Sequence, residues 1–387
     1  MKTIMNICIV SPWTLPSVGG TQKLVHGIAA GLCSHDKFNV TVITAEYDSK
    51  MIGVVDDVEM TSFPYEVVRL PLKACPPNFT TNCGFQVEES WILENVPATI
   101  SRICPHVVLY TPHACAFGIQ ALHGARLCSA TFVLWPAIHL DRWDHTCTDA
   151  IQFYRLADII VANSLREANW LKNRVGLKAE RVQLLGCGYS AQCIEVAQLR
   201  STRVENGKPL KLLSVGQLRE HKHFCDQVEA VNILVHELGI EATLTIAGAR
   251  FEAFDELKTR IQRLNLEGRV CLLLNCTEKE LRGNYLSSDF FLFTSSSESF
   301  GLAVLEAIAC GVFPIVYPGH VYSDMVIESG FGVVVEAKTP HALAKGIAET
   351  SRKSYASVNS VQLSSVEWLG NRSSHAIATR LGSILLK

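Results

Sequence analysis

The sequence lacks an excess of charge of either sign. Its 387 residues include 35 Lys and Arg against 37 Asp and Glu, for a net charge of −2 at pH 7. Proteins that bind nucleic acid present clustered positive charge to the phosphates, so no nucleic-acid partner is expected. Hydrophobic residues make up 48% of the chain and charged residues 19%, which excludes a disordered protein and indicates a globular one.

Long hydrophobic runs are also missing. No stretch reaches the roughly 18 uncharged apolar residues that a membrane-spanning helix requires, and the best candidate, 302–317, contains Glu306 and Gly311. The apolar run before Ser11-Pro12 has only about seven residues, fewer than the core of a signal peptide, and predicts a first buried strand. We expect a cytoplasmic protein. A mean hydropathy of +0.19 leaves peripheral association with the inner face of a membrane open.

The fourteen cysteines include no C-x-x-C pair. They are scattered from Cys8 to Cys310, and a chain of this length does not need disulfides for stability. The same spacing disfavours a structural zinc site, which uses closely spaced ligand pairs. We therefore expect reduced, mostly buried thiols and no metal.

Short apolar runs rich in β-branched residues alternate with amphipathic stretches, a pattern typical of βαβ units and parallel sheets. In the first half, strands are predicted at 6–10, 40–44, 67–70, 107–110, 131–134, 159–162 and 182–185, with helices that include 22–33, 88–102 and 164–175. In the second half, strands are predicted at 211–215, 242–246, 270–274, 290–293, 312–316 and 332–335, with helices at 223–237, 254–264, 278–286, 302–310 and 340–350.

A polar segment separates the two series. Residues 193–209 contain Asn206-Gly207 and Lys208-Pro209, which break regular structure. We predict two doubly wound α/β domains, 1–195 and 208–370, followed by a C-terminal segment 371–387 with a helix at 373–386. Ligands of such sheets bind at the carboxyl ends of the strands, and the expected site is the cleft that two facing domains form.

The first candidate for chemistry is the turn after the first strand. Pro16 and the pair Gly19-Gly20 precede a predicted helix, where glycine lets a ligand approach the backbone and the first amides of the helix can bind an anion. The structural alternative is a tight turn that needs positive φ. No G-x-G-x-x-G occurs, so the dinucleotide-binding fingerprint is absent.

The second candidate is SVGQLREHKHF, which follows the first strand of the second domain. It places Gly216, Arg219, His221 and Lys222 at the carboxyl end of that strand. Arg and Lys there could neutralise the two phosphates of a diphosphate without a metal. The alternative is charge that is simply solvated on a loop.

The third and most specific candidate is TSSSESFGLAVLEAIACGVFPIV, residues 294–316. It predicts a strand, a Ser-rich turn, a helix that begins near Phe300 and Gly301, and Gly311 as its stop. The amides of Phe300, Gly301 and Leu302 could bind phosphate, and a carboxylate can accept two hydrogen bonds from a diol such as ribose. Glu306 is the only charged residue in 299–317, so we expect it to have a polar partner, unless it lies at the rim of the helix.

These motifs together resemble the retaining glycosyltransferases of the GT-B fold, specifically glycosyltransferase family 4 (glycosyl transferases group 1). Glu298 and Glu306 match the Glu-x7-Glu motif of that family within ESFGLAVLEAIACG. The glycine turn, ADIIVANS (157–164), LLGCG (184–188) and LTIAGA (244–249) occur in the order of the family. The resemblance covers nearly the whole chain, and it implies two Rossmann-like domains whose final helix crosses back to the N-terminal domain.

The resemblance implies a hexosyltransferase that moves a sugar from a nucleoside diphosphate sugar, UDP- or GDP-linked, to an acceptor hydroxyl. The second domain would bind this donor. Lys222 would contact its diphosphate, Glu298 the hydroxyls of the transferred sugar and Glu306 the ribose, while the amides at 300–302 hold phosphate oxygens. The N-terminal domain would bind a glycan or lipid-linked acceptor, and glycan, polysaccharide or glycolipid biosynthesis is the expected setting.

Further residues follow from the resemblance. Gly19 and Gly20 would cap the diphosphate from the opposite domain, and His139 would lie near the reacting sugar, although a lone histidine is often structural. The family usually has Arg directly after the glycine of the second-domain loop. This chain has Gln217 there, so the second cationic contact falls to Arg219, two residues on.

The implied mechanism is same-face attack through an oxocarbenium-like transition state, with no covalent glycosyl-enzyme, no cofactor and no required metal. Two other functions stay open: a nucleotide-sugar epimerase or hydrolase on the same fold, and a non-catalytic nucleotide-sugar-binding subunit, which Gln217 motivates. A nicotinamide-dependent dehydrogenase is disfavoured by the missing glycine fingerprint. We expect the base of the donor near 274–278 and the acceptor pocket near 48–86.

Overall fold

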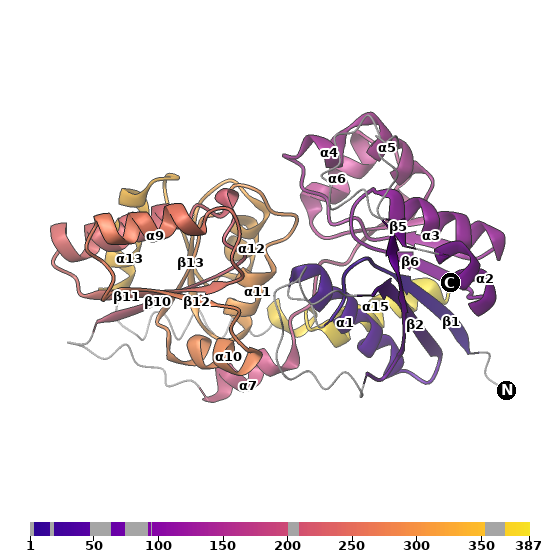
Figure 1. The fold of residues 1–387 in the computed structure, drawn as a ribbon, viewed down its shortest axis with the longest axis horizontal. Helices are drawn as coiled ribbons and strands as arrows, with labels where there is room; N and C mark the ends of the chain where they lie inside the picture. The colour runs from indigo at the N-terminus through magenta and orange to yellow at the C-terminus, as the bar shows by residue number, and fades with distance from the viewer. Residues whose placement is uncertain are drawn as a thin grey trace. The chain divides into compact units, whose positions relative to one another are not determined.

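The computed structural model describes residues 4–15, 19–46, 63–73, 92–93, 95–199, 209–352 and 368–387 (Figure 1). These residues divide into two units. Unit 1 holds the described residues up to Gly188 together with Ser374–Lys387, and unit 2 runs from Tyr189 to Ser373. The predicted acceptor segment 48–86 lies mostly outside the described residues, as do Pro16 and residues 200–208 of the predicted linker.

Unit 1 is built on a seven-stranded parallel sheet of order β3-β2-β1-β6-β7-β8-β9. All seven strands predicted for the first half are present. They are β1 (Met5–Val10), β2 (Phe38–Ala45), β3 (Glu66–Leu70), β6 (Val107–Tyr110), β7 (Thr131–Leu134), β8 (Ile159–Ala162) and β9 (Val182–Leu184). The central strands are buried apolar runs, as expected when helices cover both faces of a parallel sheet. A separate antiparallel pair joins β4 (Leu72–Lys73) to β5 (Ile92–Leu93).

The helices of unit 1 include one from the end of the chain. They are α1 (Gly20–Cys33), α2 (Val96–Ile103), α3 (Ala116–Leu127), α4 (Trp143–Thr146), α5 (Thr148–Arg155), α6 (Leu165–Asn173), the 3-10 turn η2 (Ala179–Arg181) and α15 (Ser374–Leu385). Helix α15 packs against α1, which confirms the predicted return of the last helix. The approach is close at Gly31, where a Cβ atom would lie 2.5 Å from the Cβ atom of Ala378.

Unit 2 is built on a six-stranded parallel sheet of order β12-β11-β10-β13-β14-β15. Its strands are β10 (Leu210–Val215), β11 (Ala242–Gly248), β12 (Val270–Leu274), β13 (Phe290–Phe293), β14 (Phe313–Val316) and β15 (Val333–Val334). Its helices are α7 (Ala191–Leu199), η3 (Glu220–Lys222), α8 (Phe224–Asn232), the π-helix η4 (Ile233–Glu237), α9 (Phe254–Arg263), α10 (Glu278–Ser287), α11 (Leu302–Ala309), α12 (Val321–Ser329) and α13 (Pro340–Ser351). Figure 1 shows α9 and α13 on one side of this sheet and α10 and α7 on the other. The doubly wound prediction is confirmed.

Two segments differ from the expectation. The predicted helix 88–102 is wrong in its first half, because Ile92–Leu93 form β5 and the helix starts only at Val96, with a proline in its first turn. The predicted linker 193–209 is helical up to Leu199. This helix, α7, packs against α10 and α11, so the chain passes from unit 1 to unit 2 at Gly188–Tyr189, before the helix.

The cysteines within the described residues are all free thiols, and half of them are buried. None of the helices described is both long enough and apolar enough to cross a membrane.

Candidate functional site

The carboxyl ends of β10 and β13 in unit 2 carry two loops that are tied together by hydrogen bonds. The hydroxyl of Thr294 donates to the carbonyl of Lys222 at 2.7 Å, and the amide of Ser296 donates to the carbonyl of His221 at 2.8 Å. Gln227 from α8 donates to Thr294 Oγ1 at 2.8 Å. The Ser-rich turn therefore has a structural task, which is to fix the 3-10 turn η3 (Glu220–Lys222) beside the loop that precedes α11.

Lys222 and Glu298 meet at this junction. Nζ of Lys222 donates to Oε1 of Glu298 in an ion pair whose side chains are 15% and 12% exposed. Lys222 also lies above the ring of Phe293, with Nζ 5.6 Å from its centroid. A Cβ atom on Gly216 would lie 3.7 Å from Cε of Lys222, so Gly216, Lys222 and Glu298 are neighbours. The sequence placed all three in a donor site, and the structure brings them together.

His221 lies in the same turn and is uncharged at neutral pH. Burial lowers its pKa to about 4, and the positive charge of Lys222 adds to that effect. The cation that contacts Glu298 is therefore Lys222, and His221 contributes a neutral ring.

Helix α11 begins beside this pair. Gly301 is its N-cap residue with φ of +89°, and Leu302 is its first residue. A Cβ atom on Gly301 would lie 2.7 Å from the Cβ atom of Tyr322, so both the backbone conformation and the space favour glycine. Phe300 is buried at 9% exposure. Gly311 follows the helix at φ of +70°, which fits its predicted role as a stop.

Glu306 lies within α11 and is 6% exposed, so it does not sit at the rim of the helix. Its charge acts on Tyr285 of α10, whose pKa is raised well above the usual range by burial and then by Glu306. The hydroxyl of Tyr285 is buried and has no hydrogen-bond partner within the part of the chain that the structure describes. The sequence did not single out Tyr285, because its pattern is that of an ordinary helix residue facing the core.

The side chain of Arg219 has other contacts. Its Nε donates to Oε1 of Gln217 at 3.0 Å, and its guanidinium lies 4.0 Å from the ring centroid of Phe251. Gln217, which stands where the family usually has Arg, thus orients the arginine that was expected to replace it. The role of Arg219 as a diphosphate contact stays a prediction.

The remaining predicted residues belong to unit 1. His139 follows β7, and its amide donates to Nδ1 of His145 at 3.0 Å. Because this nitrogen accepts, the neutral ring of His145 carries its proton on Nε2. His145 is 2% exposed, its pKa is lowered by burial and by the charge of His113, and its ring stacks on that of His113 at 4.2 Å.

A buried carboxylate that the sequence did not reveal holds the same loop. Oε1 of Glu167 accepts from the amide of Ile138 at 3.0 Å, and Oε2 accepts from the amide of Asn163 at 2.7 Å. Glu167 is 1% exposed, and burial raises its pKa to about 7 against the lowering effect of the two amides. The residue before Ile138, Ala137, adopts a left-handed φ of +48°. Ser164 caps α6 by accepting from the amide of Glu167, but the Glu167 carboxylate does not return to the amide of Ser164 to complete a capping box; it accepts from the loops that follow β7 and β8.

Gly19 and Gly20 are arranged differently from the tight-turn alternative. Gly19 is the N-cap of α1 with an extended φ of 167°, and Gly20 is the first residue of the helix. Neither residue adopts a left-handed conformation. Their role at a diphosphate, like that of His139, stays a prediction.

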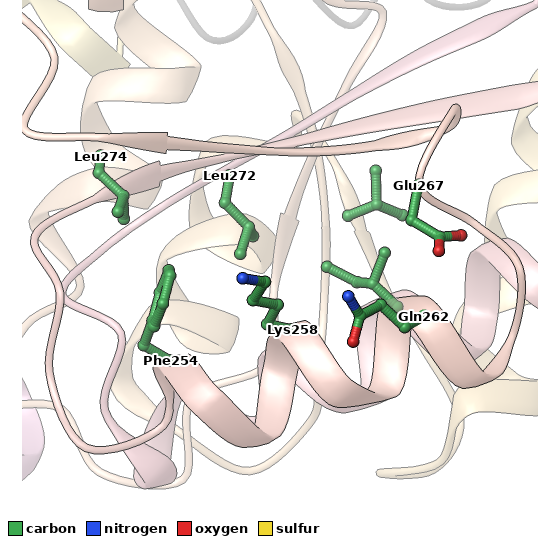
Figure 2. Close-up of a pocket in the computed structure, with 8 residues that line it drawn as sticks. Phe254, Lys258, Gln262, Glu267, Leu272 and Leu274 are labelled. Atoms are coloured by element: carbon green, nitrogen blue, oxygen red, sulfur yellow. The ribbon is translucent and has the colours of Figure 1, made fainter.

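A groove of about 280 Å³ lies between α9 and the edge strand β12 (Figure 2). Figure 2 shows Phe254 and Lys258 rising from α9 toward Leu272 and Leu274. Its lining residues are Phe254, Lys258, Ile261, Gln262, Glu267, Val270, Leu272 and Leu274. None of the catalytic or donor-binding residues predicted above lines this groove, and Leu274 alone belongs to the segment expected near the base.

The match to a known protein family lies in unit 2, the unit that contains the predicted donor site. Residues 196–359 match the family model described as glycosyl transferases group 1. Mannosylfructose-phosphate synthase of Agrobacterium fabrum is 24% identical over 173 residues, 42% of this chain and 38% of that protein. GDP-mannose:cellobiosyl-diphosphopolyprenol alpha-mannosyltransferase of Xanthomonas oryzae pv. oryzae is 30% identical over 102 residues, 26% of this chain and 27% of that protein. The chain thus matches less than half the length of these relatives.

Solved structures resemble the chain over almost its full length. Anabaena Alr3699/HepE in complex with UDP and glucose superimposes with a TM-score of 0.76 at 15% identity, covering 98% of this chain and 99% of that one. Sucrose-phosphate synthase from Thermosynechococcus elongatus gives a TM-score of 0.75 at 17% identity, covering 98% of both chains. At these identities the likeness establishes the fold. Residues 196–359 are thus similar to the glycosyl transferases group 1 family, and the two parallel-sheet units have the GT-B fold.

Proposed function

We propose that the protein is a retaining glycosyltransferase of family 4. It moves a sugar from a UDP- or GDP-linked donor to an acceptor hydroxyl in glycan, polysaccharide or glycolipid biosynthesis. The observation that carries the proposal is the shielded Lys222–Glu298 pair, which lies next to Gly216 and the start of α11 inside the region matched by the family model. Two relatives named above support a sugar-transfer reaction, and the Anabaena structure holds UDP and glucose.

In the proposed donor complex, Lys222 binds the diphosphate together with the amides at the start of α11. Glu298 accepts hydrogen bonds from the hydroxyls of the transferred sugar, and Glu306 accepts from the ribose. Lys222 is well placed for this task because its stem lies beside Gly216, where no side chain blocks a phosphate. The neutral His221 adds no competing cation.

In the transfer step, the bond between the anomeric carbon and the diphosphate oxygen breaks while the acceptor oxygen bonds to the same face of that carbon. The proton of the acceptor passes to the leaving diphosphate oxygen, so charge and atoms balance. Negative charge grows on the diphosphate, and Lys222 with the helix amides stabilises it. Losing one such preorganised contact typically lowers the rate by about 10²–10³-fold.

The test is donor turnover by the purified full chain. Release of nucleotide from UDP-glucose and GDP-mannose is measured with and without a panel of sugar and lipid-linked acceptors. We expect acceptor-dependent release in the wild type and a loss of about 10²–10³-fold in Lys222→Ala and Glu306→Ala. Lys258→Ala, which removes a lysine of unit 2 from the groove beside α9, serves as the control.

Other outcomes favour other functions. Full activity in both site variants overturns the assignment of the site. Acceptor-independent release or alteration of the sugar indicates a hydrolase or an epimerase. Donor binding without any turnover indicates a binding subunit. The anomeric configuration of the product, read by NMR, decides whether the transfer retains configuration.

A further inference from the structure

The ion pair between Lys222 and Glu298 sets up a competition inside the proposed donor site. In the structure, Nζ of Lys222 donates to Oε1 of Glu298. A diphosphate that binds Lys222 must therefore share this ammonium group with the carboxylate or draw it away. Because both groups would be anions on one cation, the position of Glu298 affects which diphosphates the site accepts.

The pair is shielded enough for this competition to matter. The two side chains are 15% and 12% exposed, and the ring of Phe293 lies beneath the ammonium group. The charge of Glu298 also reaches Tyr322, whose pKa is raised by burial and then by this carboxylate. Charges that are partly withdrawn from water interact more strongly, and a carboxylate that loses its cation there is destabilised.

Two other basic residues of the turn differ from Lys222 in charge or in contacts. His221 is neutral, since its pKa is about 4. The guanidinium of Arg219 is held by Gln217 and stacks on Phe251. A ligand that draws Lys222 away weakens its contact with Glu298, and a ligand that offers the carboxylate a hydrogen-bond donor compensates for this loss.

We propose that Glu298 makes the site prefer a nucleoside diphosphate sugar to the nucleoside diphosphate alone. This inference rests on the proposed function, in which the site binds such donors. The sugar brings hydroxyl groups that donate to Glu298 as Lys222 turns to the diphosphate. The free diphosphate brings no such donor, and its terminal phosphate carries further negative charge near pH 7. Glu298 thus weakens retention of the product, so that nucleotide leaves after transfer.

Calorimetry on the full chain tests this. The dissociation constants of UDP, UDP-glucose, GDP and GDP-mannose are measured for the wild type and for Glu298→Gln, which keeps the size of the side chain and removes its charge. We expect the nucleoside diphosphate to bind about tenfold tighter in the variant, while the nucleotide sugar binds equally well or more weakly. A tenfold change corresponds to about 1.4 kcal/mol.

A matched control comes from another ion pair of unit 2. Glu229 contacts Arg260 at 2.7 Å, the two side chains are 27% and 29% exposed, and neither residue belongs to the proposed site. Glu229→Gln should leave all four dissociation constants unchanged. If Glu298→Gln proves unstable, Lys222→Met and Lys222→Met/Glu298→Gln are compared instead, because replacing both partners of a shielded pair is tolerated better than replacing one. The two variants should bind the nucleoside diphosphate equally well, because no ammonium group is left to compete for. A gain in the double variant would mean that Glu298 repels phosphate directly and would overturn the inference.

The outcomes separate this inference from the proposed function. If the wild type binds a nucleotide sugar but Glu298→Gln leaves the preference over the nucleoside diphosphate unchanged, the inference is wrong and the proposed function stands. If the wild type binds none of the four ligands, both are wrong. A gain of equal size for sugar and diphosphate forms also overturns the inference, because Glu298 would then repel phosphate without discriminating.

Discussion

Each unit has a loop at the carboxyl end of its sheet that is held by a glutamate with little exposure, but the two glutamates have different partners. Glu167 of unit 1 accepts from two backbone amides and is 1% exposed. Glu298 of unit 2 contacts a lysine, and its side chain is 12% exposed. Backbone amides cannot leave, so the first arrangement fixes a loop. A lysine can turn to another anion, so the second arrangement is suited to a site that exchanges ligands.

The largest effect that would sharpen this comparison is the loss of Glu167. Glu167→Ala leaves two buried amides without acceptors, at about 1–3 kcal/mol each, so the free energy of unfolding should fall by about 2–6 kcal/mol. Glu298→Ala should lower it less, by about 1–3 kcal/mol, because the long side chain of Lys222 can reach water and the two amides cannot. Urea unfolding followed by Trp fluorescence measures both. Equal losses would show that the two glutamates have the same structural role.

The pH dependence of stability separates the two glutamates further. Folding raises the pKa of Glu167 to about 7, so its protonated form is favoured in the folded protein. The stability that this gives is complete below the ordinary pKa of a glutamate and is lost as the pH rises through 7, by about 3 kcal/mol.

Measuring the free energy of unfolding of wild type and Glu167→Gln at pH 5 and pH 8 isolates this contribution. The wild type should lose about 2.5 kcal/mol more than the variant over this interval. His145, whose pKa is lowered by burial, titrates in both proteins and cancels from the difference. The same loss in both proteins would mean that Glu167 stays charged in the folded state.

A smaller effect tests how tightly the loop of unit 2 is built. Gly301→Ala places a Cβ atom 2.7 Å from the Cβ atom of Tyr322 at a φ of +89°, and should lower the free energy of unfolding by about 2 kcal/mol. Gly283→Ala is the control, since Gly283 is exposed within α10 and has open space around it. That variant should gain about 0.5–1 kcal/mol. Thermal unfolding reports both changes, and a tolerated Gly301→Ala would show that this loop is free to adjust.

The smallest effects are expected at two tyrosines, one in each unit, whose hydroxyl groups donate to a backbone carbonyl of the loop described above. Tyr154 donates to the carbonyl of His145 at 2.9 Å in unit 1, and Tyr322 donates to the carbonyl of Ser295 at 2.5 Å in unit 2. Tyr154→Phe and Tyr322→Phe each remove one buried hydrogen bond, so each should lower the free energy of unfolding by about 1 kcal/mol. A much larger loss in one unit would show that its loop depends on a single contact.

Local sequence patterns predicted most of the fold. Every predicted strand is present, because short apolar runs rich in β-branched or aromatic residues and bounded by turn residues suit buried parallel strands. The prediction of a helix at 88–102 was wrong in its first half because the apolar spacing there did not indicate the short strand β5. The proline in the first turn of α2 marks the true start of the helix at Val96. The boundary predicted at 193–209 lies too late in the chain, because the helix α7 that precedes the polar segment already belongs to unit 2, and only its packing on α10 and α11 shows this.

Some residues of the candidate site could be predicted from the sequence, and others could not. Gly216, Lys222, Glu298 and the start of α11 lie on short motifs at strand ends, and the parallel sheet brings such ends together. Glu167, His145 and Tyr285 have no such signal, since a buried polar residue looks like any other helix residue until its partners are known. The contact between Arg219 and Phe251 joins residues 32 positions apart and could not be predicted from spacing.

The sequence by itself determined the two parallel-sheet units, the order of their strands and helices, and the residues at the ends of β10 and β13. These follow from patterns within short windows, where burial and helix signals act locally. Only the tertiary structure decided which charges meet. It shows that Lys222 pairs with Glu298, that Arg219 stacks on Phe251, and that Glu167 is buried and accepts from two backbone amides. Such contacts depend on how separate strands pack side by side.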